Sequence, residues 1–178
     1  LGRSQLAEPA WAKKEKEGRA SDIKPCINCL IGCIDRGMLS HTPIHCTVNP
    51  SLYRFECKPV EKAETRKQVA VVGAGPAGCE AALTASKRGH QVTIYEKRCI
   101  GGAMIEASKP ENKANIKRLI HYYEDHIMHD PNITLVKEEV EYETLVHSGY
   151  DAVIIAVGGK TRILNVPGIE KNSVIYAS

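Results

Sequence analysis

The chain has 178 residues, which is enough for one domain or for one domain and a small module. Its apolar content of 43% and charged content of 25% are ordinary for a globular protein. The net charge of +3 is weak and no basic stripe is interleaved with aromatic residues, so we expect no nucleic-acid partner. The longest apolar run, near AVIIAV, is too short to cross a membrane, so we expect no membrane partner either.

The cysteines and the two ends of the chain indicate where the protein works. The seven cysteines are an odd number, and four of them have metal-ligand spacing, which favours ligation over disulfides. Together with the expected absence of a signal peptide, this predicts a reducing, cytoplasmic location. The chain starts at LGRSQ without Met and stops at SVIYAS, so we expect it to be part of a longer polypeptide.

The first third of the chain has little regular pattern. Residues 4–18 have helical composition, and because Pro9 interrupts them we expect one helix from about Glu8 to Gly18. Residues 19–66 contain Cys, Pro and Gly with weak periodicity, so a segment of this length needs something to hold it. A metal cluster would suffice.

Residues 67–178 alternate strand and helix patterns. Strands are expected at 68–73, 91–96, 133–136 and 151–158, and helices at 76–89 and 111–128. This alternation predicts an α/β fold with a Rossmann-like parallel sheet.

Four cysteines, Cys26, Cys29, Cys33 and Cys46, have the spacing C-x2-C-x3-C-x12-C. Three clustered thiolates and one remote thiolate are typical of ligands of a [4Fe–4S] cluster. Structural zinc is the main competitor, but it usually takes two CxxC-type pairs separated by a loop. Either His41 or His45 could replace a ligand, although a packed or solvated role is the simpler interpretation of both.

A glycine motif, GAGPAG, stands between the first expected strand and the helix after it. Gly73 permits a tight turn, Gly75 lets a pyrophosphate approach the backbone, and Gly78 lets helix and strand pack closely. The helix N-terminus then faces the phosphates. Glu96 ends the next strand, where a carboxylate accepts from the ribose hydroxyls and repels a 2′-phosphate.

The remaining features refine this dinucleotide site. The pair Gly101-Gly102 and the strand end Ala156-Val157-Gly158 are typical of flavoproteins with two dinucleotide domains, although Ala-Thr-Gly is the usual form of the strand end. We therefore expect FAD, or ADP alone, to be bound by Gly73, Gly75, Pro76, Ala77, Gly78, Glu96, Lys97, Gly101, Gly102, Ala156, Val157 and Gly158. The other cysteines, Cys57, Cys79 and Cys99, are expected to be structural.

The two motifs together carry a resemblance that spans essentially the whole chain. The order GR, EP, EGR, DI-PC-x2-C-x3-C, CTVNP and VAVVGAGPAG resembles the iron–sulfur flavoenzymes of the old yellow enzyme group, such as 2,4-dienoyl-CoA reductase, 2-enoate reductase and trimethylamine dehydrogenase. That family has an FMN-binding (β/α)8 barrel, a cluster segment and an FAD domain that contains an NAD(P)H domain. The resemblance assigns residues 1–18 to the end of the barrel, 19–66 to the cluster segment and linker, and 67–178 to part of the FAD domain.

The resemblance also implies a function. Electrons would pass from NAD(P)H to FAD, through the cluster to FMN, and on to an activated C=C bond. The barrel with FMN and the NAD(P)H domain would be the partners of this chain within the same polypeptide, and the chain alone would be inactive, with no catalytic residue of its own. A dehydrogenase with ADP in the dinucleotide site and a non-catalytic ADP- or FAD-binding scaffold with structural zinc remain alternatives.

Overall fold

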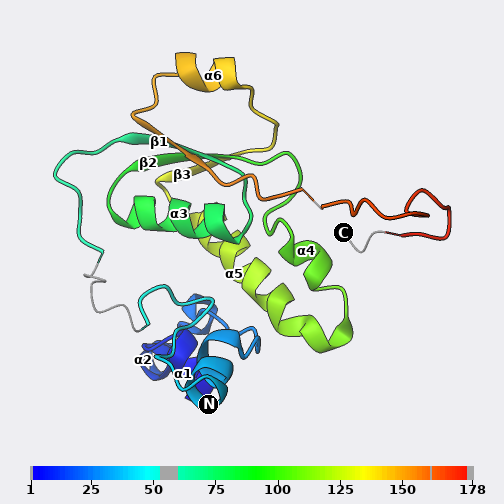
Figure 1. The fold of residues 1–178 in the computed structure, drawn as a ribbon. Coiled ribbons are helices and arrows are strands. Elements are labelled where there is room, and N and C mark those ends of the chain that lie inside the picture. Colours follow the sequence, from blue (N-terminus) through cyan, green and yellow to red (C-terminus); the bar gives the residue numbers. More distant parts are fainter. Residues whose placement is uncertain (1, 53–59, 161, 176–178) are drawn as a thin grey trace.

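The computed structural model describes residues 2–52, 60–160 and 162–175. Its centre is a sheet of four strands, β1 (Gln68–Val72), β2 (Gln91–Tyr95), β3 (Ile133–Val136) and β4 (Ala152–Ile155). The strands are ordered β3-β2-β1-β4 and every pairing is parallel, with Val69 opposite both Val92 and Ala152 (Figure 1). The predicted α/β fold is confirmed.

Burial explains why the two central strands are so apolar. Val71, Val92 and Ile94 are fully buried, as expected for strands with neighbours on both edges and helices on a face. The edge strand β4 differs from its prediction, because it ends at Ile155 and that side chain is 65% exposed. The apolar composition of residues 151–158 predicted a buried strand. Among the described residues, β4 is instead an edge strand with an exposed side chain at its end.

Two longer helices pack on the same side of the sheet (Figure 1). Helix α3 (Pro76–Lys87) starts with proline at its first position, where the missing N–H costs nothing, and α5 (Ala114–His129) follows the 3₁₀ turn η3 (Glu111–Lys113). The buried face of α5 is the apolar stripe that its 3.6-residue period predicts. Two short helices, α4 (Met104–Ala107) and α6 (Tyr142–His147), have no counterpart in the sequence prediction.

The first third of the chain contains more regular structure than expected. The helix expected from about Glu8 to Gly18 is present but shorter, as α2 (Trp11–Lys16), and α1 (Gly2–Ala7) was not expected. The two helices are separated at Pro9, where a Glu8 carboxylate oxygen accepts the Ala10 N–H at 3.1 Å. The 3₁₀ turn η1 (Ala20–Asp22) and the π-helix η2 (Ile31–Leu39) follow.

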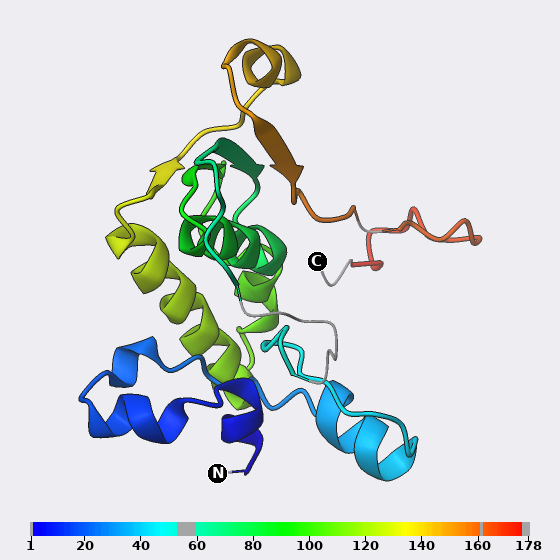
Figure 2. The same cartoon turned by 90° about the vertical axis from the view of Figure 1, so that its left-hand side faces the viewer.

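One hydrophobic core joins this first third to the sheet. Ala7 and Val48 belong to the same buried cluster as Val71 and Cys79. The Asn49 side-chain amide, itself buried, donates to the Leu6 carbonyl at 2.9 Å and ties the chain after the fourth motif cysteine back to α1. Figure 2 shows this region packed beside α5.

None of the helices in the described residues is long and apolar enough to cross a membrane.

Candidate functional site

Two positions around the turn after β1 accept only glycine: Gly73 in the turn and Gly78 in the first turn of α3. Gly73 has φ +99°, and a Cβ there would lie 2.5 Å from the Ala156 carbonyl oxygen. A Cβ on Gly78 would lie 1.8 Å from the Gly73 carbonyl oxygen. The first turn of α3 therefore packs directly on the backbone of the loop, as the sequence pattern predicts for Gly78.

The start of α3 is open to an anion. Gly75 is the extended residue before the helix, Pro76 is its first residue, and among the described residues no side chain caps the end. The N–H groups of the first turn and the positive end of the helix dipole therefore lie beside the glycine turn. Ala77 belongs to this same first turn, so the residues from Gly73 to Gly78 form one continuous cradle.

The second glycine pair lies directly against this cradle. The Gly101 N–H donates to the Ala74 carbonyl at 2.8 Å. Gly102 has φ +52°, and a Cβ there would lie 2.8 Å from the Gly75 Cα. Two loops whose contacting residues are 27 positions apart along the chain therefore touch through their backbones, beside the glycine turn.

Glu96 is fixed at the carboxyl end of β2 by two backbone amides. One carboxylate oxygen accepts the Ala74 N–H at 2.8 Å and the other accepts the Arg98 N–H at 2.8 Å. Each oxygen has a further lone pair to offer, so the carboxylate can still accept hydroxyl groups from a ligand. The carboxylate thus sits at the edge of the glycine turn with a defined orientation.

A pocket opens beside Glu96 at the carboxyl ends of the four strands. It is lined by Val72, Gly73, Tyr95, Glu96, Lys97, Glu138, Glu139, Val140 and Val157. The Lys97 ammonium binds Glu139 at 2.7 Å, and this hydrogen bond raises the pKa of Lys97. The Tyr95 hydroxyl contacts the Tyr150 hydroxyl at 2.9 Å, which, together with burial, raises the pKa of Tyr95 to about 12.

Sequence reasoning missed Glu138, Glu139 and Val140 as pocket residues. They follow β3, which is next to β2 in the sheet. Because ligands of open α/β sheets bind at the carboxyl ends of the strands, the strand predicted at 133–136 indicates which end to inspect, but not that this strand pairs with β2 beside Glu96.

The end of β4 completes the site from the other side. The Ala156 N–H donates to the Val72 carbonyl at 2.8 Å, and Ala156 packs against both Gly73 and Gly78. Val157 lines the pocket, whereas Gly158 has φ +76° and open space where a Cβ would be. The structure therefore brings the expected dinucleotide residues together, with Gly158 the most peripheral of them.

The four motif cysteines line a second pocket. Its walls are mainly apolar and also include Arg3 and Leu6 from α1 and His45 from the returning chain; the cysteines are Cys26, Cys29, Cys33 and Cys46. The contribution of α1 was not expected, and nothing in the spacing of the cysteines indicates it. His41 is not among the residues that line this pocket.

Backbone contacts bring the remote cysteine to the other three. The His45 N–H donates to the Gly32 carbonyl at 2.8 Å, and a Cβ on Gly32 would lie 2.4 Å from the His45 carbonyl oxygen. Arg36 of the π-helix donates to the Pro43 carbonyl at 3.0 Å. The contacts of Pro43 and His45 with η2 therefore place Cys46 beside this helix.

Four cysteines around one pocket are a candidate ligand set for a metal centre, and zinc and an iron–sulfur cluster place different demands on their spacing. Tetrahedral zinc with Zn–S bonds of about 2.3 Å needs sulfurs about 3.8 Å apart around one point. Within residues 2–52, 60–160 and 162–175, no three His, Cys, Asp or Glu side chains are arranged to hold one metal ion. An iron–sulfur cube binds one thiolate at each of four corners, so its ligands surround a larger object.

Cys79 and Cys99 are not among the residues that line this pocket. Cys79 is buried in α3, where its thiol donates to the Ala74 carbonyl at 3.2 Å and burial raises its pKa to about 12. Cys99 is exposed and Cys57 lies outside the described residues. The structural interpretation of Cys79 agrees with its burial.

A parallel sheet with a glycine turn, a ribose-type carboxylate and a helix N-terminus defines a dinucleotide-binding α/β protein. Residues 67–177 match the family described as "Pyridine nucleotide-disulphide oxidoreductase". The chain belongs to this family of flavin-dependent NAD(P)H oxidoreductases.

Relatives with known names resemble the chain over nearly all of its length. An NADH oxidase of Thermoanaerobacter brockii is 38% identical over 97% of the chain, and a cinnamate reductase of Clostridium sporogenes is 34% identical over 96%. A solved 2-naphthoyl-CoA reductase complex matches 98% of the chain at 33% identity, with a TM-score of 0.91. The resemblance seen in the sequence is confirmed. The chain spans about a quarter of these proteins, namely 27%, 26% and 27% of their lengths.

Proposed function

We propose that the chain is the electron-transfer part of an NAD(P)H-dependent flavin/iron–sulfur oxidoreductase that reduces an activated C=C bond of the enoate or dienoyl-CoA type. In it, electrons pass from FAD through a [4Fe–4S] cluster to FMN. The observation that carries the proposal is that one core presents both a dinucleotide cradle and a pocket lined by four cysteines.

The dinucleotide cradle is proposed to bind the ADP half of FAD. The backbone between Gly73 and Gly78 and the start of α3 receive the pyrophosphate, and Gly101-Gly102 closes over it. The fixed carboxylate of Glu96 accepts the ribose hydroxyls, and the pocket beside Lys97 and Val157 receives the adenine side. ADP alone would satisfy the same contacts.

The cysteine pocket is proposed to hold the cluster through Cys26, Cys29, Cys33 and Cys46. Such a cluster takes one electron at a time, whereas a flavin exchanges one or two. The pocket walls are mainly apolar, and hydrogen bonds such as that from the Asn28 N–H to the Cys26 sulfur at 3.5 Å orient the thiols. Thiolate ligands also favour a reducing compartment, so we propose a cytoplasmic location.

The electrons and protons of the proposed reaction come from NAD(P)H and solvent, which bind or act outside this chain. NAD(P)H supplies two electrons and one proton, solvent supplies the second proton, and the C=C bond becomes CH–CH. The FMN barrel and the NAD(P)H domain are the proposed partners in the same polypeptide, and no catalytic residue is assigned within this chain. The chain alone is therefore proposed to be inactive.

The test compares two activities of the complete polypeptide in anaerobic solution. Cys33→Ser should abolish NAD(P)H-dependent reduction of cinnamate-type or enoyl-CoA substrates, yet it should keep NAD(P)H-dependent reduction of a soluble dye that accepts electrons from flavin. Cys99→Ser, which changes an exposed cysteine, is the matched control and should retain both activities.

Two results would overturn the proposal. Full reduction of the C=C substrate by the Cys33→Ser variant would remove the cysteine pocket from the electron path. Oxidation of a secondary amine, with no reduction of any enoate, would instead assign the protein to amine dehydrogenases, such as the dimethylamine dehydrogenase of Hyphomicrobium that is 39% identical over 54% of the chain.

A further inference from the structure

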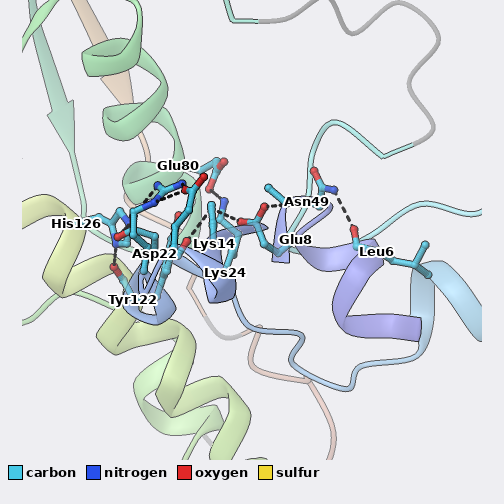
Figure 3. Close-up of polar contacts among 12 residues, drawn as sticks. Leu6, Glu8, Lys14, Asp22, Lys24, Asn49, Glu80, Tyr122 and His126 are labelled. Atoms are coloured by element: carbon cyan, nitrogen blue, oxygen red, sulfur yellow. Dashed lines mark hydrogen bonds and ion pairs between the residues drawn. The ribbon is translucent and has the colours of Figure 1, made fainter. Parts of the chain in front are cut away.

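A polar contact joins the segment before the first motif cysteine to the helix after the glycine turn (Figure 3). The Lys24 ammonium binds a carboxylate oxygen of Glu80 at 2.7 Å, across 56 residues of sequence. The Tyr123 hydroxyl of α5 donates to the same oxygen at 3.1 Å. One carboxylate thus connects three parts of the molecule.

This contact is withdrawn from water. The Lys24 side chain is 12% exposed, Glu80 is 29% exposed and Tyr123 is buried. The ammonium also lies 5.6 Å and 5.8 Å from the ring centroids of Tyr122 and Tyr123. A charge pair with this burial and a third hydrogen-bond partner holds its geometry far better than an exposed pair such as Lys13–Glu17, which is 4.0 Å apart.

The two ends of the contact lie next to the two candidate sites. Lys24 stands two residues before Cys26, and Pro25 between them restricts the backbone. Glu80 stands two residues after Gly78, within the first turns of α3. The two candidate sites are therefore connected by two residues of backbone on each side and by the ion pair between Lys24 and Glu80.

The neighbouring contacts of Figure 3 hold other parts of the segment. Lys14 binds Glu8 at 2.6 Å and donates to the Asp22 carbonyl at 2.8 Å. The Asp22 carboxylate lies 3.9 Å from the His126 ring nitrogen. These contacts fasten α2 and η1 but do not reach either site, so they provide a comparison for the Lys24 contact.

We propose that Lys24, together with Glu80 and Tyr123, is a positioning device that fixes the cysteine pocket at a set distance from the phosphate-binding turn. The inference rests on the proposed function, because a fixed separation matters when electrons pass between the groups bound at the two sites. Electron transfer slows steeply as donor and acceptor move apart, so loss of the contact should slow transfer without emptying either site.

The first experiment needs no cofactor. Hydrogen–deuterium exchange is measured on the complete polypeptide for wild type, Lys24→Met, Glu80→Gln, the conservative Lys24→Arg and the control Lys13→Met. Exchange in residues 23–30 and at the start of α3 should rise in Lys24→Met and Glu80→Gln, return toward wild type in Lys24→Arg and stay unchanged in Lys13→Met. Unchanged exchange in Lys24→Met and Glu80→Gln would show that the contact holds nothing in place and would overturn the inference.

The second experiment separates positioning from simple stabilisation. The rate of electron transfer from FAD to the cluster is measured in the anaerobic holoenzyme and expressed per molecule that carries both groups. The midpoint potentials of FAD and of the cluster are measured on the same sample. Since small displacements of reacting groups cost up to about a hundredfold, we expect about a tenfold slower transfer in Glu80→Gln with both potentials unchanged. A lower melting temperature with an unchanged transfer rate would assign the contact to stability alone and overturn the inference.

The outcome also distinguishes this inference from the proposed function. Wild-type protein without iron would overturn the proposed function, and the inference with it, even if the exchange results showed that the contact holds the segment. If Lys24→Met does not fold, Glu80→Gln and the exchanged pair Lys24→Glu/Glu80→Lys decide the matter, because the exchanged pair should restore transfer to within about threefold of wild type if the ion pair sets the distance.

Discussion

The turn after β1 and the pocket lined by four cysteines are held by different kinds of contact. The turn is a strand–loop–helix unit in which glycine backbone touches glycine backbone, as Gly78 does with Gly73. The pocket is surrounded by irregular chain, α1 and a π-helix, and contacts between distant residues support this region, such as His45 with Gly32 and Lys24 with Glu80. The first site is therefore determined locally, while the second depends on tertiary packing.

This difference has a consequence for substitutions. In the turn, a single added methyl group collides with backbone that cannot move away, so the effect should be steric and large. In the cysteine pocket, one lost thiol removes a ligand but leaves the surrounding backbone supported by Asn49 and the core. The following predictions run from the largest expected effect to the smallest.

Gly78→Ala should be the most damaging change. Its Cβ would meet the Gly73 carbonyl oxygen at 1.8 Å, so the turn must deform, with an expected loss of about 3 kcal/mol of stability and of measurable ADP binding. Denaturant unfolding and calorimetric titration with ADP measure the two effects. Gly159→Ala, which has nothing within 4 Å, is the control, and equal effects of the two changes would contradict the proposed packing.

Cys33→Ser should separate the two sites. We expect loss of iron from the anaerobic protein but an ADP affinity within about threefold of wild type, because the turn does not depend on this thiol. Metal analysis and ADP titration on the same sample measure both. A parallel loss of ADP binding would show that the two sites do not form independently.

Glu96→Ala should weaken ADP binding by about tenfold or more, because a charged acceptor of ribose hydroxyls is lost and the Ala74 and Arg98 amides lose their partner. Titration with ADP measures the change. Glu143→Ala on α6, away from the pocket, is the control. An unchanged affinity in Glu96→Ala would remove this carboxylate from the ribose.

Gly102→Ala tests the contact between the two glycine loops. Both Gly102 and Gly149 have positive φ, but only Gly102 would bring a Cβ within 4 Å of other atoms. Gly149→Ala therefore reports the backbone strain alone, at about 1 kcal/mol, and Gly102→Ala should exceed it by about 1 kcal/mol or more. Equal losses of unfolding free energy would mean that the loops can separate freely.

Acid should loosen the first third of the chain before the sheet. Burial alone would raise the pKa of Glu8, but hydrogen bonds from Lys14 and the Ala10 N–H outweigh it and lower the pKa below 4.5. The folded state then binds its proton less readily than the unfolded state, so this stabilisation is present above pH 4.5 and is lost as pH falls through the folded pKa. Stability measured against pH should fall less steeply in Glu8→Gln than in wild type, and an identical slope would contradict this.

The sequence was most informative where structure is local. The glycine spacing, the strand before it and Glu96 are all determined within 30 residues, so the dinucleotide cradle could be assembled from pattern alone. Glu138 to Val140 were missed because the pattern names a strand but not its neighbours in the sheet. The helix expected from Glu8 to Gly18 was placed too wide, and α1 was missed, because Pro9 and the Glu8 carboxylate separate two short helical segments.

The cysteine region could be predicted only in its chemistry. Spacing identified four candidate ligands, but it could not indicate a π-helix at Ile31–Leu39 or the contribution of Arg3 from α1 to the pocket. Those features come from tertiary packing, as does the ion pair between Lys24 and Glu80. The spacing of the cysteines indicates which kind of metal centre they can bind, whereas the surrounding contacts determine where in the fold that centre lies.

The most direct test of the account is the stoichiometry of iron, acid-labile sulfide, zinc and flavin in one anaerobic preparation, with its visible spectrum. The account predicts about four iron and about four sulfide per chain, a broad visible absorption and adenine dinucleotide or ADP bound at the cradle. One zinc per chain, with no sulfide and no visible absorption, would contradict it and would make the cysteine pocket a structural metal site.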